Sequence, residues 1–188
     1  MIFMTNKTEQ KIMDAALEIF AKNGFKSSTT KSIAEKSGFT EMTLFRKFGT
    51  KKNLYEMVLN QKVKLMLDDF NKNVFNGTEY DNVRDFIANF VIKTQQVMMN
   101  NFEVFYISLN EENKSMEKMM GEQTNAAGNY LKQHIKNPEI DYATLGISII
   151  SFVYILNLEN YHNRKASFGK SAESVVENFI EMIYCMVK

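Results

Sequence analysis

Few side chains in this sequence could act as metal ligands or nucleophiles. The chain has one cysteine, Cys185, and two histidines, His134 and His162. A single cysteine excludes an internal disulfide framework and a cysteine-based zinc cluster, and two histidines do not suggest a multi-histidine metal site. The sequence also lacks a glycine-rich phosphate loop and a Gly-x-Ser-x-Gly elbow. We therefore expect that the protein is not an enzyme and has no metal and no cofactor.

The side chains that could recognise a partner by charge are concentrated at the N-terminus. The whole chain is almost neutral, with 23 basic and 22 acidic residues among 188. Residues 1–52 nevertheless hold ten basic and five acidic side chains, whereas the remaining 136 residues hold 13 and 17. A basic block on a weakly acidic body is typical of a segment that contacts a polyanion, although a solvated basic face has the same composition.

The pattern inside the basic block predicts short helices that could position these charges. Apolar residues recur on one helical face over 12–20, and Gly24 supplies a stop. Thr29 or Thr30 can cap a second helix. That helix ends at Gly38, because glycine adopts the left-handed conformation after a helix at little cost.

A third helix is predicted over 41–48, with Thr40 as its cap and with Leu44 and Phe48 on its core face. Two helices joined by a short turn that contains glycine form a helix-turn-helix, and the second of them enters the major groove of DNA. The side chains left on the other faces of this helix are Glu41, Thr43, Phe45, Arg46 and Lys47.

This stretch closely resembles the N-terminal domain of TetR-type transcriptional repressors, without a gap over about residues 8–58. The resemblance rests on Gly24-Phe25, Thr29-Thr30, Ile33-Ala34, Gly38-Phe39-Thr40, Thr43-Leu44-Phe45, Phe48, Lys51 and Leu54. It implies an all-α homodimer, in which three N-terminal helices bind DNA and a larger helical domain dimerises and binds a regulatory ligand. The DNA contacts it implies come from Thr29, Thr30, Lys31, Thr40, Glu41, Thr43, Phe45, Arg46, Lys47 and Lys51.

Three positions depart from the pattern of that family. Phe45 stands where many members have tyrosine, so a hydroxyl contact to phosphate is missing. Glu41 could accept a hydrogen bond from a cytosine amine, or it could simply complement the dipole of its own helix. Gly49 replaces a frequent proline before the fourth helix. Because of these departures, the resemblance does not predict the operator sequence.

Beyond the basic block, periodicity predicts six more helices, giving an all-α fold of about nine helices in total. We expect a helix-turn-helix DNA-binding domain over 1–50 and a helical ligand-binding and dimerisation domain over 51–188. The predicted helices span 51–73, 80–99, 102–109, 116–135, 142–161 and 171–187.

The segment 142–161 is apolar almost all round and must be covered on both sides. Its charge-free run of 17 residues, 142–158, reaches only the lower edge of membrane-spanning length, so a buried or interface helix is the favoured interpretation. We find no signal peptide and expect a cytoplasmic protein without a membrane partner. The resemblance implies a four-helix dimer interface with 171–187, ordinary burial in a monomer being the alternative. The interface residues are Ile149, Phe152, Val153, Leu156, Val176, Phe179, Ile180 and Ile183.

Methionine and aromatic residues gather in the middle of the chain and suggest a pocket for a small, largely apolar effector, although plain core has the same pattern. The predicted function is a sequence-specific regulator, a repressor that a ligand releases from an approximately palindromic operator. The alternative is a helix-turn-helix protein controlled by a protein partner or by no effector. The ligand-binding candidates are Met66, Phe90, Thr94, Met98, Phe105, Met120, Gln123 and Tyr130.

Overall fold

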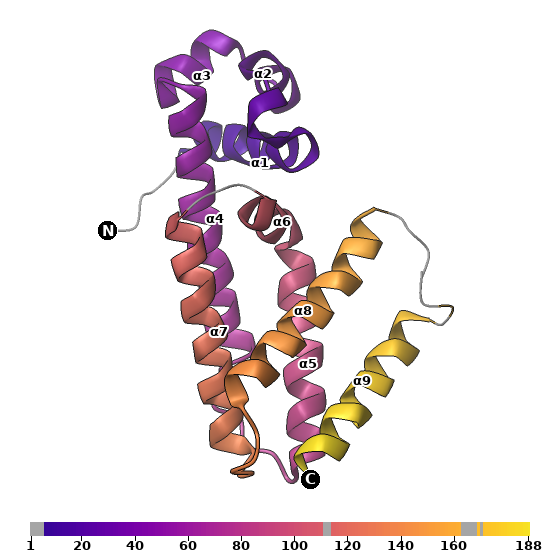
Figure 1. Cartoon of the computed structure of the whole chain (residues 1–188). Coiled ribbons are helices and arrows are strands. Elements are labelled where there is room, and N and C mark those ends of the chain that lie inside the picture. Colours follow the sequence, from indigo (N-terminus) through magenta and orange to yellow (C-terminus); the bar gives the residue numbers. More distant parts are fainter. Residues whose placement is uncertain (1–5, 111–113, 163–168, 170) are drawn as a thin grey trace. The chain divides into compact units, whose positions relative to one another are not determined.

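The computed structural model of the protein describes the backbone of residues 6–110, 114–162, 169 and 171–188, and the side chains of 6–107, 121–162, 169 and 171–188. In this described part the chain forms nine α-helices and no strand (Figure 1), which confirms the all-α class. The helices are α1 (Lys7–Ser27), α2 (Thr30–Ser37), α3 (Glu41–Phe48), α4 (Lys51–Asn73), α5 (Val83–Asn100), α6 (Phe102–Asn110), α7 (Lys114–His134), α8 (Tyr142–Tyr161) and α9 (Ala172–Val187).

The helix ends follow local capping chemistry. Asn6 accepts a hydrogen bond from the Thr8 amide, and Glu9 accepts one from the Asn6 amide, so α1 begins with a capping box. Near its end α1 is interrupted at Gly24, where φ is +73°, as the predicted stop requires. The start of α5 lies three residues later than predicted because the Asn82 side chain caps it.

Two compact units divide the chain, with the boundary inside α4. One unit contains α1, α2, α3, the part of α4 up to Met66, and α6 from Glu103 onward. The other contains the rest of α4 from Leu67, together with α5, α7, α8 and α9. We call them the N-terminal unit and the C-terminal unit. The core of the N-terminal unit includes Ile12, Ala16, Phe20, Ile33, Leu44 and Val58, which are all fully or almost fully buried.

In the C-terminal unit, α7 and α8 cross closely at two glycines. A Cβ atom on Gly128 would lie 3.0 Å from the carbonyl oxygen of Tyr142, and one on Gly146 would lie 3.3 Å from the Gly128 amide nitrogen. Both distances are shorter than nine in ten of the contacts that real Cβ atoms make. Because Gly128 has no side chain, α8 can lie this close to α7.

Within the described residues, α8 is long and apolar enough to cross a membrane by length and composition alone. A helix in the core of a protein passes the same test. One third of its most apolar window is buried inside the chain. The large apolar side chains that α8 exposes are Ile147 and Ile155.

Candidate functional site

The turn between α2 and α3 is held by threonine caps and one glycine. The Thr29 hydroxyl accepts a hydrogen bond from the Ser32 amide at 3.0 Å, and the Thr40 hydroxyl accepts one from the Thr43 amide at 3.2 Å. Gly38 follows α2 in the left-handed conformation, with φ at +76°. The predicted caps are confirmed, and Thr29 rather than its neighbour starts α2.

Thr30 has another role in the N-terminal unit. Its hydroxyl donates to the Glu41 carboxylate, with 2.6 Å between Oγ1 and Oε2, and so joins the first turn of α2 to the first turn of α3. A carboxylate in the first turn of a helix also complements the helix dipole. Both observations favour a role for Glu41 in holding α3 in place, over a contact with a base.

Lys47 points back toward α1 instead of away from the domain. Its ammonium lies 2.8 Å from Glu9 Oε1, and both side chains are partly buried. The hydrogen bond from Lys47 lowers the pKa of Glu9 below its ordinary value. This ion pair joins α3 to α1 and orients the helix whose outer face is exposed.

The Lys51 side chain binds the main chain of the segment that follows the break in α1. Its Nζ atom donates to the carbonyl oxygens of Phe25 and Ser28, each at 2.8 Å, and to that of Lys26 at 3.4 Å. The ammonium also lies 4.4 Å from the centroid of the Phe25 ring, within the range of a cation–π interaction. The ammonium group of Lys51, one of the predicted DNA contacts, is thus bound to main-chain carbonyls that the end of a helix leaves unpaired.

The predicted DNA-contact residues therefore fall into two groups. Lys31, Phe45 and Arg46 are exposed, and so are the capping residues Thr29 and Thr40. Sequence reasoning missed Met42, whose side chain is 81% exposed. Its position carried a signal, because a residue two places before the buried Leu44 lies on the opposite face of a helix. The other group is half-buried and makes side-chain hydrogen bonds within the unit; it contains Thr30, Glu41, Thr43, Lys47 and Lys51.

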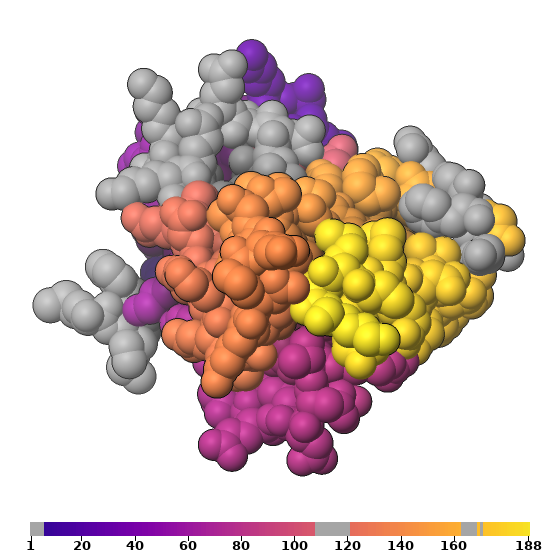
Figure 2. All heavy atoms as spheres, turned by 60° about the horizontal axis from the view of Figure 1, so that its bottom comes forward, coloured from indigo at the N-terminus to yellow at the C-terminus, as the bar shows by residue number. Residues whose placement is uncertain are grey.

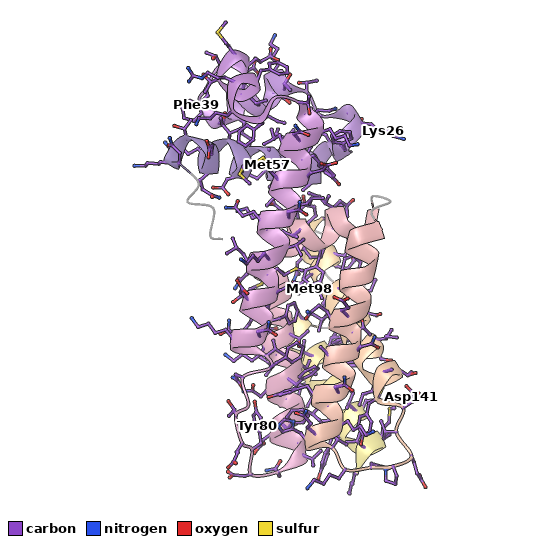
Figure 3. The ribbon with its side chains drawn as sticks, turned by 90° about the vertical axis from the view of Figure 1, so that its left-hand side faces the viewer. Lys26, Phe39, Met57, Tyr80, Met98 and Asp141 are labelled. Carbon is purple, nitrogen blue, oxygen red and sulfur yellow. The ribbon has the colours of Figure 1, made fainter. Side chains whose placement is uncertain are left out.

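Part of the predicted ligand set lies together in the C-terminal unit. Phe90, Thr94 and Met98 recur every four residues on one face of α5, and all three are buried. Met98 is labelled in Figure 3. The ring of Tyr130 on α7 stacks against Phe90, with 6.0 Å between centroids. Gln123 lies two turns before Tyr130 and on the same face of α7.

Three of these residues, Thr94, Gln123 and Tyr130, carry buried polar atoms that lack a hydrogen-bond partner in the described part of the chain. Among the described residues, neither Thr94 Oγ1 nor Gln123 Oε1 has a hydrogen-bond partner, and Thr94 is only 1% exposed. Leaving such an atom unpaired costs about 1–3 kcal/mol, so natural proteins rarely keep one without a reason. Burial also raises the pKa of Tyr130. These atoms are available to a ligand or to an internal water.

The remaining predicted ligand residues lie in the other unit or outside the described side chains. Met66 and Phe105 are buried, but they belong to the N-terminal unit. The side chain of Met120 lies outside the described residues. A hollow of about 440 Å³ is present at one end of the C-terminal unit, and none of the predicted ligand residues lines it. Its lining comes from Val83, Ile135–Pro138, Tyr184, Val187 and Lys188, which are magenta, orange and yellow in Figure 2.

The predicted interface residues of α8 and α9 differ in how far the chain itself buries them. Phe152 and Phe179 are partly exposed and stack on each other, with 3.6 Å between ring centroids. The other six face the interior of their own unit, because they lie on the inner stripe of each helix and pack against neighbouring helices; they are Ile149, Val153, Leu156, Val176, Ile180 and Ile183. The exposed apolar side chains of these helices are Ile147, Ile155, Met182 and Met186.

Comparison with known proteins agrees with this arrangement. Residues 12–58 match the family described as bacterial regulatory proteins, tetR family. The uncharacterized HTH-type transcriptional regulator YvkB of Bacillus subtilis (strain 168) is 44% identical over 54 residues, 29% of each chain. The match thus spans less than a third of that relative.

Solved structures of regulators share the fold along almost the whole chain. KstR2 of Mycobacterium tuberculosis superposes with a TM-score of 0.73 at 14% identity, over 98% of this chain and 97% of that one. A putative fatty acid metabolism regulator of Clostridium perfringens gives 0.69 at 17% identity, over 90% and 94%. These relatives are regulators and not enzymes. Residues 12–58 thus match the tetR family of bacterial regulatory proteins, and the chain as a whole shares its fold with these solved regulators.

Proposed function

We propose that this protein is a dimeric transcriptional repressor that binds an approximately palindromic operator in the cytoplasm and is released by a small, largely apolar effector. One observation carries the DNA-binding half of this proposal. The outer face of α3, the second helix of the helix-turn-helix, is exposed at Arg46 and Phe45, while its inner face is anchored by buried and ion-paired side chains.

The exposed residues suit the two kinds of contact that DNA requires. Arg46 on α3 can donate to base edges or phosphate, and Lys31 and the N-terminus of α2 at Thr29 can hold phosphate oxygens. Lys47 and Lys51 act as positioning residues, because their ammonium groups are engaged with Glu9 and with main-chain carbonyls. The basic excess of residues 1–52 adds a favourable term that does not depend on sequence.

Dimerisation would place one α3 helix in each of two successive major grooves. We infer that the second copy covers the exposed apolar side chains of α8 and α9, since those helices otherwise leave Ile155 and Met182 in water. A two-fold symmetric protein recognises a two-fold symmetric site, which is why the operator is expected to be approximately palindromic.

The proposal that an effector binds rests on the unpaired polar atoms of Thr94 and Gln123, which lie among buried apolar side chains. A ligand that is mostly apolar, with a hydroxyl or amide group to meet these atoms, would satisfy both features. Two structural neighbours are described as a ketosteroid transcriptional regulator and a putative fatty acid metabolism regulator. Both descriptions name largely apolar molecules that carry polar groups, which supports the same class of ligand here.

Binding of the purified protein to fragmented genomic DNA tests this function. We expect selection of a short set of fragments at physiological salt, and a larger loss of affinity for them in Arg46→Ala than in Lys52→Ala, whose side chain is exposed on α4. No preference for any fragment over bulk DNA would refute the DNA-binding proposal. A panel of hydrophobic compounds that leaves the complex intact would favour control by a protein partner or by no effector.

A further inference from the structure

The outer face of α3 carries two large apolar side chains in water. Met42 is 81% exposed, the highest value among the large apolar side chains that the structure describes, and Phe45 is 47% exposed. Residues three positions apart lie on the same face of a helix. The two side chains therefore form one apolar surface, which we call the Met42/Phe45 surface.

The polar neighbours of this surface are engaged elsewhere in the N-terminal unit. Glu41 accepts from the Thr30 hydroxyl at 2.6 Å, and the hydroxyls of Thr40 and Thr43 are hydrogen-bonded to each other at 3.0 Å. These contacts use part of the hydrogen-bonding capacity that the first turn of α3 could offer to a base edge. What the first turn presents outward is chiefly the Met42 thioether.

Only one base offers an apolar group in the major groove. Thymine presents its C5 methyl group there, whereas cytosine, guanine and adenine present only hydrogen-bond donors and acceptors. A thioether and a phenyl ring bury a methyl group well and satisfy neither a donor nor an acceptor.

We propose that the Met42/Phe45 surface reads thymine C5 methyl groups, so that each operator half-site carries thymine where α3 places these two side chains. This inference rests on the proposed function, because it requires that α3 lie in the major groove. Met42 and Phe45 would then determine specificity without making a hydrogen bond to any base. It also explains why a helix that contacts DNA keeps apolar side chains exposed.

The test uses the full-length protein and an operator obtained from its own genomic selection. Each thymine of the operator is replaced in turn by deoxyuridine, which lacks only the C5 methyl group, and the dissociation constant is measured at fixed salt. We expect about a fourfold loss at one or two thymines of each half-site, the value of burying one methyl group. Symmetric replacement in both half-sites should cost about 15-fold.

Variants of the protein test whether Met42 contacts the thymine methyl group. In Met42→Ala the loss caused by deoxyuridine at its thymine should disappear, because the side chain that contacts the methyl group is gone. Alanine suits an exposed helical position, so the fold should be unaffected. Met57→Ala is the matched control, since Met57 (labelled in Figure 3) is also an exposed methionine of this unit but lies on α4. It should keep the full deoxyuridine effect.

The outcomes separate the two proposals. If the wild-type protein selects an operator but tolerates deoxyuridine at every thymine, the methyl-reading proposal is wrong and the proposed function stands. A deoxyuridine effect that persists unchanged in both Met42→Ala and Phe45→Ala would also overturn it. If no operator is selected, the proposed function itself fails. Loss of the deoxyuridine effect in Met42→Ala but not in Met57→Ala supports it.

Discussion

Thr94 links the stability of the ligand-free protein to its response to an effector. Its hydroxyl is buried on α5 and has no hydrogen-bond partner in the described part of the chain. Thr94→Val keeps nearly the same shape and removes the hydroxyl. Since an unpaired buried polar group costs about 1–3 kcal/mol, the variant should unfold with a free energy higher by about that amount. For a chain of this length, each 1 kcal/mol raises the melting temperature by about 2–4 °C.

Val91→Thr is the matched control, because Val91 lies three residues earlier on α5 and is fully buried. That variant adds a buried hydroxyl and should lose about 1–3 kcal/mol. Urea titrations of the ligand-free proteins measure both changes. If Thr94→Val were destabilised instead, the hydroxyl would have a partner in solution, and the reasoning that assigns it to a ligand would be refuted.

The same substitution should have the opposite effect on ligand response. A compound that releases the wild-type protein from DNA through a hydrogen bond to Thr94 should act on Thr94→Val only at a higher concentration. The net value of one hydrogen bond, about 0.5–1.5 kcal/mol, corresponds to a shift of roughly 2- to 10-fold. An unchanged release curve would show that the effector does not use this hydroxyl.

Three further changes test the fold and the assembly. Gly128→Ala should lose about 1–3 kcal/mol of stability, because the new Cβ meets a main-chain oxygen of α8 at 3.0 Å. Gly121→Ala on the same helix meets nothing within 4 Å and should gain up to about 1 kcal/mol; thermal melts that rank the two in reverse order would contradict the close crossing. Lys51→Met should lower the stability of the N-terminal unit in hydrogen exchange, whereas Lys52→Met, 76% exposed, should not. Unchanged exchange together with a shallower salt dependence of DNA binding would instead assign Lys51 to a phosphate. Ile155→Glu should dissociate the dimer in sedimentation experiments, and an intact dimer would remove α8 from the interface.

The sequence alone determined the helices and the turn that presents α3. The bounds of α4 and α8 agree with the predicted ranges, and the caps at Thr29, Gly38 and Thr40 are where they were expected. Helical periodicity and capping depend on residues within one or two turns of each other. Such local interactions can be predicted without knowing how distant segments meet.

Only the tertiary structure decided which charged side chains remain available for recognition. Lys47 pairs with Glu9, 38 residues away, and Lys51 with carbonyls at least 23 residues away. A single sequence contains no signal for such pairs. The sequence therefore predicts Lys47, Arg46 and Lys51 equally as DNA contacts, and only the packing distinguishes them.

The faces of α8 were decided in the same way. Most side chains over 145–158 are apolar, and they lie on all sides of the helix, so hydropathy cannot distinguish the stripe that packs on α7 from the stripe that faces outward. The predicted interface included Ile149 and Val153, which are buried in their own unit, and did not include Ile155, which is exposed. The direction of that inner stripe depends on where α7 crosses, and the contact between Gly128 and Gly146 sets that crossing.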